Sequence, residues 1–333
     1  MKFKKIELPI ISFYIIIIFL SVFFILSLSL LKTNKNLESD TEKKNLISRQ
    51  QDYKLISPLL DCADETVPYI QTKILKNKIN QLVEGHIEKS NINEVSVYFR
   101  DLNNGPWISY NSEEKFSPAS LMKVPILIAY LKKAETDKSF LNEKINSGSI
   151  DNINKTQQNV KPRLEIKENT SYSVIELLES LIIYSDNNAA DILLKNLRFY
   201  ELDYVFFDLG LDFLAWETGE NFLTVRDYSS FFRILYNASY LNREMSELAL
   251  SILTKSEYDA GIKAGISDKN IVVAHKFGER VLVDSKQLHD CGIIYNYEKP
   301  YLLCIMTRGE DFLVMKDVIK EISEVFYQDL KIK

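Results

Sequence analysis

Ser117-Pro118-Ala119-Ser120-Leu121-Met122-Lys123 is the stretch that decides how this chain is interpreted, because it leads from a turn-like Ser-Pro-Ala into the apolar run Val124 to Tyr130. A serine and a lysine three positions apart on a helix lie on the same face, one turn from each other. The amine of Lys123 would then stand beside the hydroxyl of Ser120 and activate it as a nucleophile without histidine. Free N–H groups at a helix N-terminus would favour the negative charge that develops there. The alternative is structural, with Ser120 as a helix N-cap and Lys123 in solvent.

Two later motifs favour the catalytic interpretation of this pattern over the structural one. Ser185-Asp186-Asn187 follows the amphipathic run Val174 to Ile183, and Lys276-Phe277-Gly278 follows a β-rich run. Alone, the first of these motifs is typical of a helix N-cap. Together, the order S-x-x-K, S-D-N and K-x-G resembles the penicillin-recognising serine enzymes, and the spacings most resemble class A β-lactamases. The resemblance extends from about Asn93 to the C-terminus.

The resemblance implies a role for each catalytic side chain. Ser120 is the acylated nucleophile, and Lys123 is its neighbouring base or proton relay. Ser185 carries a proton to the leaving amine, while Lys276 lowers the pKa of Ser185 and attracts a substrate carboxylate. Asn187 hydrogen-bonds the substrate amide and Lys123.

The same resemblance assigns the residues that bind the substrate. The backbone N–H groups of Ser120 and Glu279 hold the oxyanion, and Gly278 belongs to the substrate-binding residues. The Glu279 side chain is expected to be unconstrained. Asp186 is expected to point away and stabilise its loop.

Two features depart from the family pattern. The middle residue of K-x-G is usually a hydroxyl residue that helps to bind the substrate carboxylate, but here it is Phe277, which we expect in the wall of the site. Arg280 is only a weak replacement for the lost donor. The family also hydrolyses its acyl-enzyme with a glutamate on a loop.

Glu217 is the candidate for that deacylating base. Trp216-Glu217 followed by Asn221 matches the spacing W-E-x-x-x-N. However, a helix is expected to begin near Thr224, so the loop is shorter than in the family. The alternative is that Glu217 is a surface acid or a structural residue and that Thr224 and Asp227 only cap and start that helix.

Composition limits the possible functions. The chain has 333 residues, enough for one large domain or two small ones, and its formal net charge is −5. This negative net charge argues against a surface that binds nucleic acid. We expect a monomer.

The N-terminus differs from the rest of the chain. The stretch from Leu8 to Leu31 is uncharged and mostly apolar, and it is long enough to form a membrane-spanning helix. Lys2, Lys4 and Lys5 precede it, which predicts a cytoplasmic N-terminus and an extracytoplasmic remainder, as in a single-pass protein of the cell membrane. A cleaved signal peptide is the competing interpretation.

We therefore expect an anchor over residues 1–32, a polar linker over 33–65 and a hydrolase domain over 66–333. Strands near both ends and helices between them predict an α/β fold. Its antiparallel sheet is built from both chain ends, has flanking helices and carries an inserted all-helical domain, as the resemblance also implies. The α/β lobe would comprise 66–115 and 257–333, and the helical lobe 116–256, with the site in the crevice between them. Expected elements are a helix over 66–90, strands over 94–101, 107–110, 271–277, 286–295 and 301–307, and a final helix over 313–330.

The three cysteines leave two alternatives open. Cys291 and Cys304 flank a predicted hairpin turn near Tyr297-Glu298, so they are able to face each other as a disulfide. We favour the other interpretation, in which both are small buried apolar residues. The spacing of the histidines predicts no metal site, and no cofactor is expected.

Three functions fit these observations. The first is a membrane-anchored hydrolase that opens a β-lactam amide through an acyl-Ser120 intermediate. The second is a D-alanyl peptidase or esterase-like relative that acts on a substrate resembling the peptidoglycan stem and turns β-lactams over poorly. The third is an extracytoplasmic binding or sensor domain without catalysis.

Overall fold

The computed structural model describes residues 53–58, 69–89, 92–103, 106–150, 159–211, 222–281, 285–296 and 299–331. The predicted membrane anchor over Leu8 to Leu31, the candidate base Glu217 and Cys62 lie outside these ranges. Among the helices within them, none has both the length and the apolar character needed to cross a bilayer. Residues Tyr53–Lys333 group into one compact unit.

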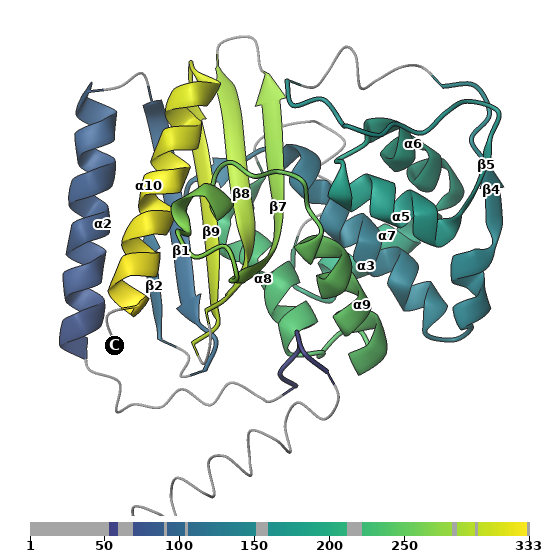
Figure 1. Cartoon of the computed structure of the whole chain (residues 1–333), viewed down its shortest axis with the longest axis horizontal. Helices are drawn as coiled ribbons and strands as arrows, with labels where there is room; N and C mark the ends of the chain where they lie inside the picture. Colours follow the sequence, from purple (N-terminus) through teal and green to yellow (C-terminus); the bar gives the residue numbers. More distant parts are fainter. Residues whose placement is uncertain are drawn as a thin grey trace, which may run out of the picture. The chain divides into compact units, whose positions relative to one another are not determined.

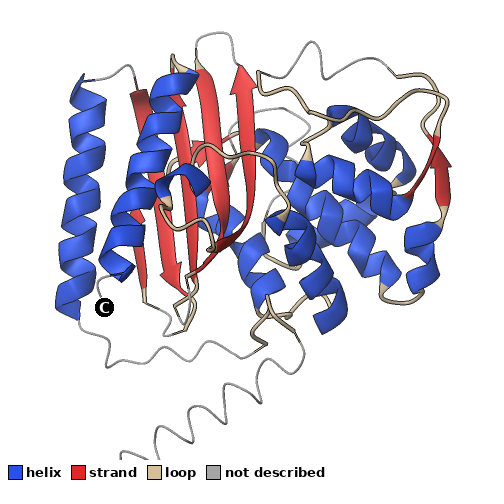
Figure 2. Cartoon of the chain, viewed as in Figure 1, coloured by secondary structure: helices blue, strands red, loops and turns tan. Residues whose placement is uncertain are grey.

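A five-stranded antiparallel sheet joins the two ends of this unit, as predicted (Figure 1, Figure 2). In spatial order its strands are β2 (Trp107–Tyr110), β1 (Ile92–Asp101), β9 (Tyr301–Gly309), β8 (Lys286–Tyr295) and β7 (Val272–Val281). The pairing of β1 with β9 runs from Asp101 opposite Tyr301 to Ile92 opposite Gly309. The fold is therefore closed by strands that lie far apart in the sequence.

Two helices from the chain ends cover one face of the sheet. They are α2 (Tyr69–Lys89) and α10 (Phe312–Lys331), which lie side by side in Figure 1. Phe99 of β1 stacks on Phe326 of α10 with ring centroids 4.7 Å apart. The predicted alternation of Val95, Val97 and Phe99 directs these side chains into this core.

The opposite face of the sheet packs against the middle of the chain. Tyr98 of β1 belongs to this second core, so β1 is buried on both faces and not only on the predicted one. The helices of this region are α3 (Lys123–Ala134), α5 (Val174–Ile183), α6 (Asn187–Asn196), α7 (Phe199–Phe207), α8 (Val225–Tyr236) and α9 (Arg243–Thr254). Helix α3 is buried on almost every side, as expected of a helix that is apolar all round.

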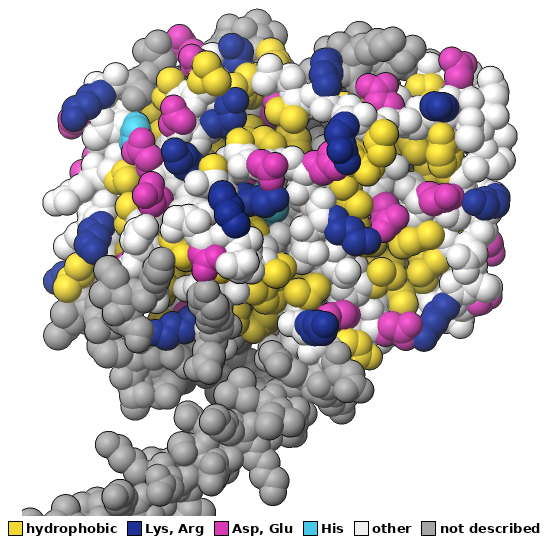
Figure 3. Space-filling model, in the orientation of Figure 1, with side chains coloured by type: hydrophobic (Ala, Val, Ile, Leu, Met, Phe, Trp, Pro, Cys, Tyr) yellow, Lys and Arg dark blue, Asp and Glu magenta, His cyan; other side chains and the backbone are white. Residues whose placement is uncertain are grey.

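Short elements complete the helical region. Strand β3 (Lys115–Phe116) pairs with β6 (Leu223–Thr224), and β4 (Lys144–Asn146) pairs with β5 (Ser171–Ser173). The 3-10 turns are η1 (Ala119–Met122), η2 (Lys138–Asn142) and η4 (Lys263–Gly265). On the face shown in Figure 3, basic and acidic side chains are interspersed.

Residues 53–58 belong to the predicted linker but pack against the folded unit. The Glu247 carboxylate of α9 accepts hydrogen bonds from the backbone N–H groups of Lys54, Leu55 and Ile56. Ile56 is 1% exposed and lies in the core. A charged acceptor that receives several N–H bonds holds this segment firmly.

A disulfide joins Cys291 of β8 to Cys304 of β9. The two residues lie opposite each other in the register of the sheet, and both are fully buried. Our preference for two buried thiols was wrong about the bond but right about the burial. A cysteine in a buried strand position shows the same apolar pattern whether or not it is oxidised, so the sequence could not separate the two alternatives.

Loss of this bond is expected to weaken the fold. Combining Cys291→Ala with Cys304→Ala should lower the free energy of unfolding by about 2–3 kcal/mol, because the cross-link no longer restricts the unfolded chain. Urea unfolding followed by circular dichroism measures this change, and Cys62→Ala is the matched control. Alkylation of all three cysteines in denatured, unreduced protein would contradict the bond.

Candidate active site

The turn that carries Ser120 leads directly into α3. Ser120 lies in η1, and Lys123 is the first residue of the α-helix. Ala119 adopts a φ of 51°, a left-handed conformation that is costly for a residue with a side chain. Ser120 is partly exposed, and its side chain does not cap the helix, so the N-cap interpretation is not supported.

Side chains from distant elements fix this turn. Gln287 Oε1 accepts a hydrogen bond from Ser117 N at 3.0 Å, and the Tyr228 hydroxyl donates to Leu121 O at 2.8 Å. The sequence analysis missed these contacts, since neither residue type signals a partner more than 100 positions away. They hold the backbone on both sides of Ser120.

His289 is a further support that the sequence analysis missed. Burial lowers its pKa to about 4, so the ring is neutral at physiological pH. Thr307 N donates to Nδ1 at 3.3 Å, which assigns the ring hydrogen to Nε2, and Nε2 then donates to Ser117 O at 3.0 Å. His289 therefore acts as a structural donor beneath the turn.

Gly278 allows β7 to approach the Ser120 turn closely. A Cβ atom at this position would lie 2.7 Å from Pro118 O and 3.0 Å from Leu121 N. Any other residue would push the strand and the turn apart. The glycine of the K-x-G motif is thus required by packing.

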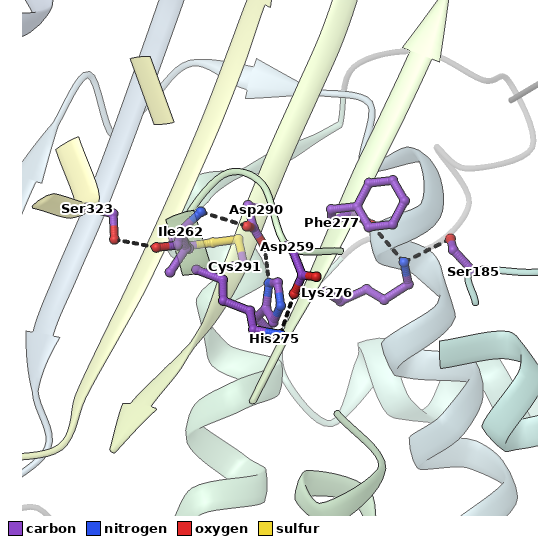
Figure 4. A network of polar contacts seen from close by, with 11 residues as sticks. Ser185, Asp259, Ile262, His275, Lys276, Phe277, Asp290, Cys291 and Ser323 are labelled. Carbon is purple, nitrogen blue, oxygen red and sulfur yellow. Dashed lines mark hydrogen bonds and ion pairs between the residues drawn. A yellow bond between two sulfur atoms is a disulfide. The ribbon is translucent and has the colours of Figure 1, made fainter. Parts of the chain in front are cut away.

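Ser185 lies where three separate segments meet. It occupies the turn between α5 and α6 with a φ of 55°, a second strained non-glycine residue in the site. Lys276 Nζ donates to Ser185 Oγ at 2.8 Å (Figure 4), and Lys123 Nζ donates to the same oxygen at 3.1 Å. The structure thus brings Lys123, Ser185 and Lys276 together, while Ser120 Oγ makes no hydrogen bond with any described residue.

Lys123 is buried and fully engaged. Besides Ser185 Oγ, its Nζ donates to Ser185 O at 2.6 Å and to Asn187 Oδ1 at 2.7 Å. Burial lowers its pKa to about 7, although the charges of Asp186 and Glu279 act in the opposite direction. An amine with this pKa exists in both protonation states near neutral pH, as a catalytic base requires.

The pKa of Lys276 is lowered even more strongly. Burial, reinforced by the charge of Lys123, holds its pKa well below the ordinary value of lysine. Its Nζ donates to Phe277 O at 2.9 Å and lies 4.1 Å from the centroid of the Phe277 ring. Two lysines that repel each other and share one hydroxyl form a short path for a proton.

Asp186 has a structural role, whereas Asn187 contacts Lys123. Asp186 is fully buried and caps α6, accepting hydrogen bonds from Asn188 N and Ala189 N through Oδ1. Its other oxygen accepts from Ile166 N at 2.7 Å, so Asp186 stabilises the loop as predicted. The motif is therefore an N-cap and a part of the site at the same time.

Phe277 packs behind the strand and is 4% exposed. Its ring stacks on Tyr258 with centroids 4.0 Å apart. On the same face of β7, His275 Nδ1 lies 2.9 Å from Asp290 Oδ1, and Asp290 Oδ2 accepts from Ile262 N (Figure 4). This buried pair contributes a nearby negative charge that raises the pKa of Lys276 against the effect of burial.

The Glu279 side chain is constrained, contrary to our expectation. It is 8% exposed, and its Oε1 accepts hydrogen bonds from Asn159 N and Val160 N, each at 2.7 Å. Arg280, the weak candidate for binding a substrate carboxylate, instead donates to Ser117 Oγ.

The role of Glu217 stays a prediction, because residues 212–221 lie outside the described part of the chain. The helix that follows is capped reciprocally by Thr224 and Asp227, as the structural alternative expected. This cap accounts for Thr224 and Asp227 without any catalytic role.

Comparisons with known proteins show the family and the fold of this chain. The model of the "Beta-lactamase enzyme family" matches residues 73–330, so the chain belongs to this family. Among curated relatives, "Beta-lactamase CTX-M-97" of Escherichia coli is 30% identical over 121 residues, which are 36% of this chain and 40% of that protein. The "Beta-lactamase" of Bacillus subtilis (strain 168) is 35% identical over 111 residues, 33% of this chain and 34% of that protein.

The chain thus spans less than half the length of the curated relatives that it matches. Among solved structures, a mutant of PBP-A described as an acyl-enzyme complex with penicillin-G aligns with a TM-score of 0.66 at 23% identity, covering 78% of this chain and 97% of that chain. This likeness concerns the fold.

The titration of Lys123 is a direct test of the site. Its ε-carbon resonance should titrate with a midpoint near pH 7, with the ammonium below and the neutral amine above that value. NMR of lysine-labelled protein measures this midpoint, and Lys123→Arg identifies the signal by removing it. A Lys123 midpoint close to the value of a free lysine would contradict the buried environment.

Proposed function

We propose that the chain is a serine hydrolase that opens a β-lactam amide through an acyl-Ser120 intermediate. The observation that carries this proposal is that two buried lysines, Lys123 and Lys276, both donate a hydrogen bond to Ser185 Oγ. Lys123 follows Ser120 by three positions in the sequence. Membership of the β-lactamase family supports the same conclusion.

In the acylation step, Ser120 Oγ attacks the carbonyl carbon of the lactam and its proton passes to neutral Lys123. The N–H groups of Ser120 and Glu279 stabilise the oxyanion. When the C–N bond breaks, Ser185 gives its proton to the leaving nitrogen and recovers one from a neighbouring lysine. The product is an ester on Ser120 with an opened amine.

Deacylation requires a water molecule and a base. We assign the base to Glu217, which follows Trp216 at the spacing expected of the family. Water then adds to the ester carbonyl, and Ser120 leaves as the alcohol after regaining a proton.

Phe277 favours a second candidate function. Without a hydroxyl at this position, an ordinary β-lactam loses a hydrogen-bond donor for its carboxylate. A D-alanyl peptidase or esterase-like enzyme that acts on a peptidoglycan-stem substrate would keep the same nucleophile and lysines, with poor turnover of β-lactams. A sensor domain would retain the acyl group indefinitely.

We further propose that the enzyme is a monomer held at the cell membrane by Leu8 to Leu31, with its hydrolase domain outside the cytoplasm. The basic residues before this stretch support the orientation. The Cys291–Cys304 disulfide supports an oxidising compartment.

A chromogenic cephalosporin tests the reaction. The protein should turn it over continuously, and Ser120→Ala should reduce the rate to background, since the residual catalysis without a nucleophile is small. Absorbance and intact mass are the measurements. A single stoichiometric burst with stable mass on Ser120 would favour the second function or a sensor domain, and a folded protein without any labelling would exclude both enzymatic functions.

The assignment of Glu217 has its own test. Glu217→Gln should leave acylation nearly unchanged and slow deacylation by about 10²-fold or more, so that acyl-enzyme accumulates. Quenched-flow mass spectrometry separates the two steps. Turnover equal to that of the unchanged protein would show that another group activates the water.

A further inference from the structure

Glu279 is the least expected charged group of the site. Its side chain is more than nine-tenths buried, and Oε1 receives both N–H groups of the segment Asn159-Val160. Oε2 is buried as well and has no hydrogen-bond partner among the described residues. A buried carboxylate oxygen without a donor is costly, so Oε2 is an unsatisfied acceptor that a donor on a bound molecule would complete.

The position of Glu279 connects this oxygen with the reacting centre. Gly278, the preceding residue, lies against the turn that carries Ser120, and β7 is the edge strand of the sheet. In the proposed mechanism the Glu279 N–H binds the oxyanion. The charge of its side chain also acts on the lysines of the site, raising the pKa of Lys123 and of Lys276 against the effect of burial.

The neighbouring lysines offer little positive charge to a ligand, because burial lowers the pKa of Lys123 to about 7 and that of Lys276 well below its ordinary value. Lys123 and Lys276 are buried and donate to Ser185 Oγ, Asn187 Oδ1 and Phe277 O. Arg280 donates to Ser117 Oγ. A ligand carboxylate beside β7 would be repelled by the Glu279 carboxylate, while the donors of these cations are already engaged.

We propose that Glu279 makes the site selective for acyl donors that present an uncharged N–H donor, such as a carboxamide, beside β7, in place of a carboxylate. Oε2 accepts the hydrogen bond from this donor, while Oε1 keeps its contacts with Asn159 and Val160. Phe277, which is buried against Tyr258, supplies no hydroxyl to bind a carboxylate. This inference rests on the proposed acylation of Ser120.

Three probes with the same acyl part test the selectivity: benzylpenicillin, its carboxamide and its methyl ester. The rate of Ser120 acylation, measured by intact mass on the full-length chain, should be about tenfold or more higher for the carboxamide than for benzylpenicillin, with the ester between them. In Glu279→Gln the ratio of carboxamide to benzylpenicillin rates should fall towards one. Glutamine removes the charge but keeps an oxygen for the N–H groups of Asn159 and Val160.

Two further variants control the result. Glu324→Gln removes the same charge from an exposed position on α10, across the sheet, and should leave the ratio unchanged. Glu279→Ser should reproduce the effect of Glu279→Gln, so the result does not depend on the folding of a single variant. Thermal melting of each protein confirms that it is folded.

The outcomes separate this inference from the proposed function. Benzylpenicillin that acylates Ser120 as fast as the carboxamide, a ratio unaffected by Glu279→Gln, or an ester as fast as the carboxamide would overturn the selectivity while leaving acylation by Ser120 intact. Absence of labelling by all three probes would overturn the proposed function, and the selectivity with it.

Discussion

Two ammonium groups that share one buried hydroxyl are the constraint on which the site depends. Lys123 begins α3, Ser185 lies between α5 and α6, and Lys276 lies on the edge strand β7. Burying two lysines side by side is unfavourable unless their charge is reduced and their donors are satisfied. The lowered pKa of each lysine and the set of oxygen acceptors around them meet both conditions.

The backbone is strained at two positions of the site. Ala119 and Ser185 both adopt left-handed φ values, one beside Ser120 and the other at the shared hydroxyl. Such conformations persist only where the surroundings determine them more strongly than local preference does. At Ala119 the hydrogen bonds between the Ser120 turn and Gln287, His289 and Tyr228 provide this determination, so the turn is supported by the sheet and α8.

The sequence predicted the architecture because strands and helices leave periodic patterns. The alternation of Val95, Val97 and Phe99 and the amphipathic run Val174 to Ile183 correspond to β1 and α5. It did not predict contacts made through backbone groups or through residues of ordinary type. The Glu279 carboxylate, for example, binds two N–H groups at 159–160, and no side chain there signals the contact.

The two faces of β7 divide the contacts of this strand. Successive side chains of a strand point to opposite faces. Lys276, Gly278 and Arg280 contact Ser185 and the Ser120 turn, whereas the alternate residues Phe277 and Glu279 contact Tyr258 and the segment 159–160. The two faces remain coupled, because the Phe277 ring lies 4.1 Å from Lys276 Nζ and the Glu279 charge raises the pKa of both Lys123 and Lys276. A substitution at Phe277 or Glu279 therefore changes the electrostatic surroundings of these lysines, while glycine at 278 keeps the strand against the turn.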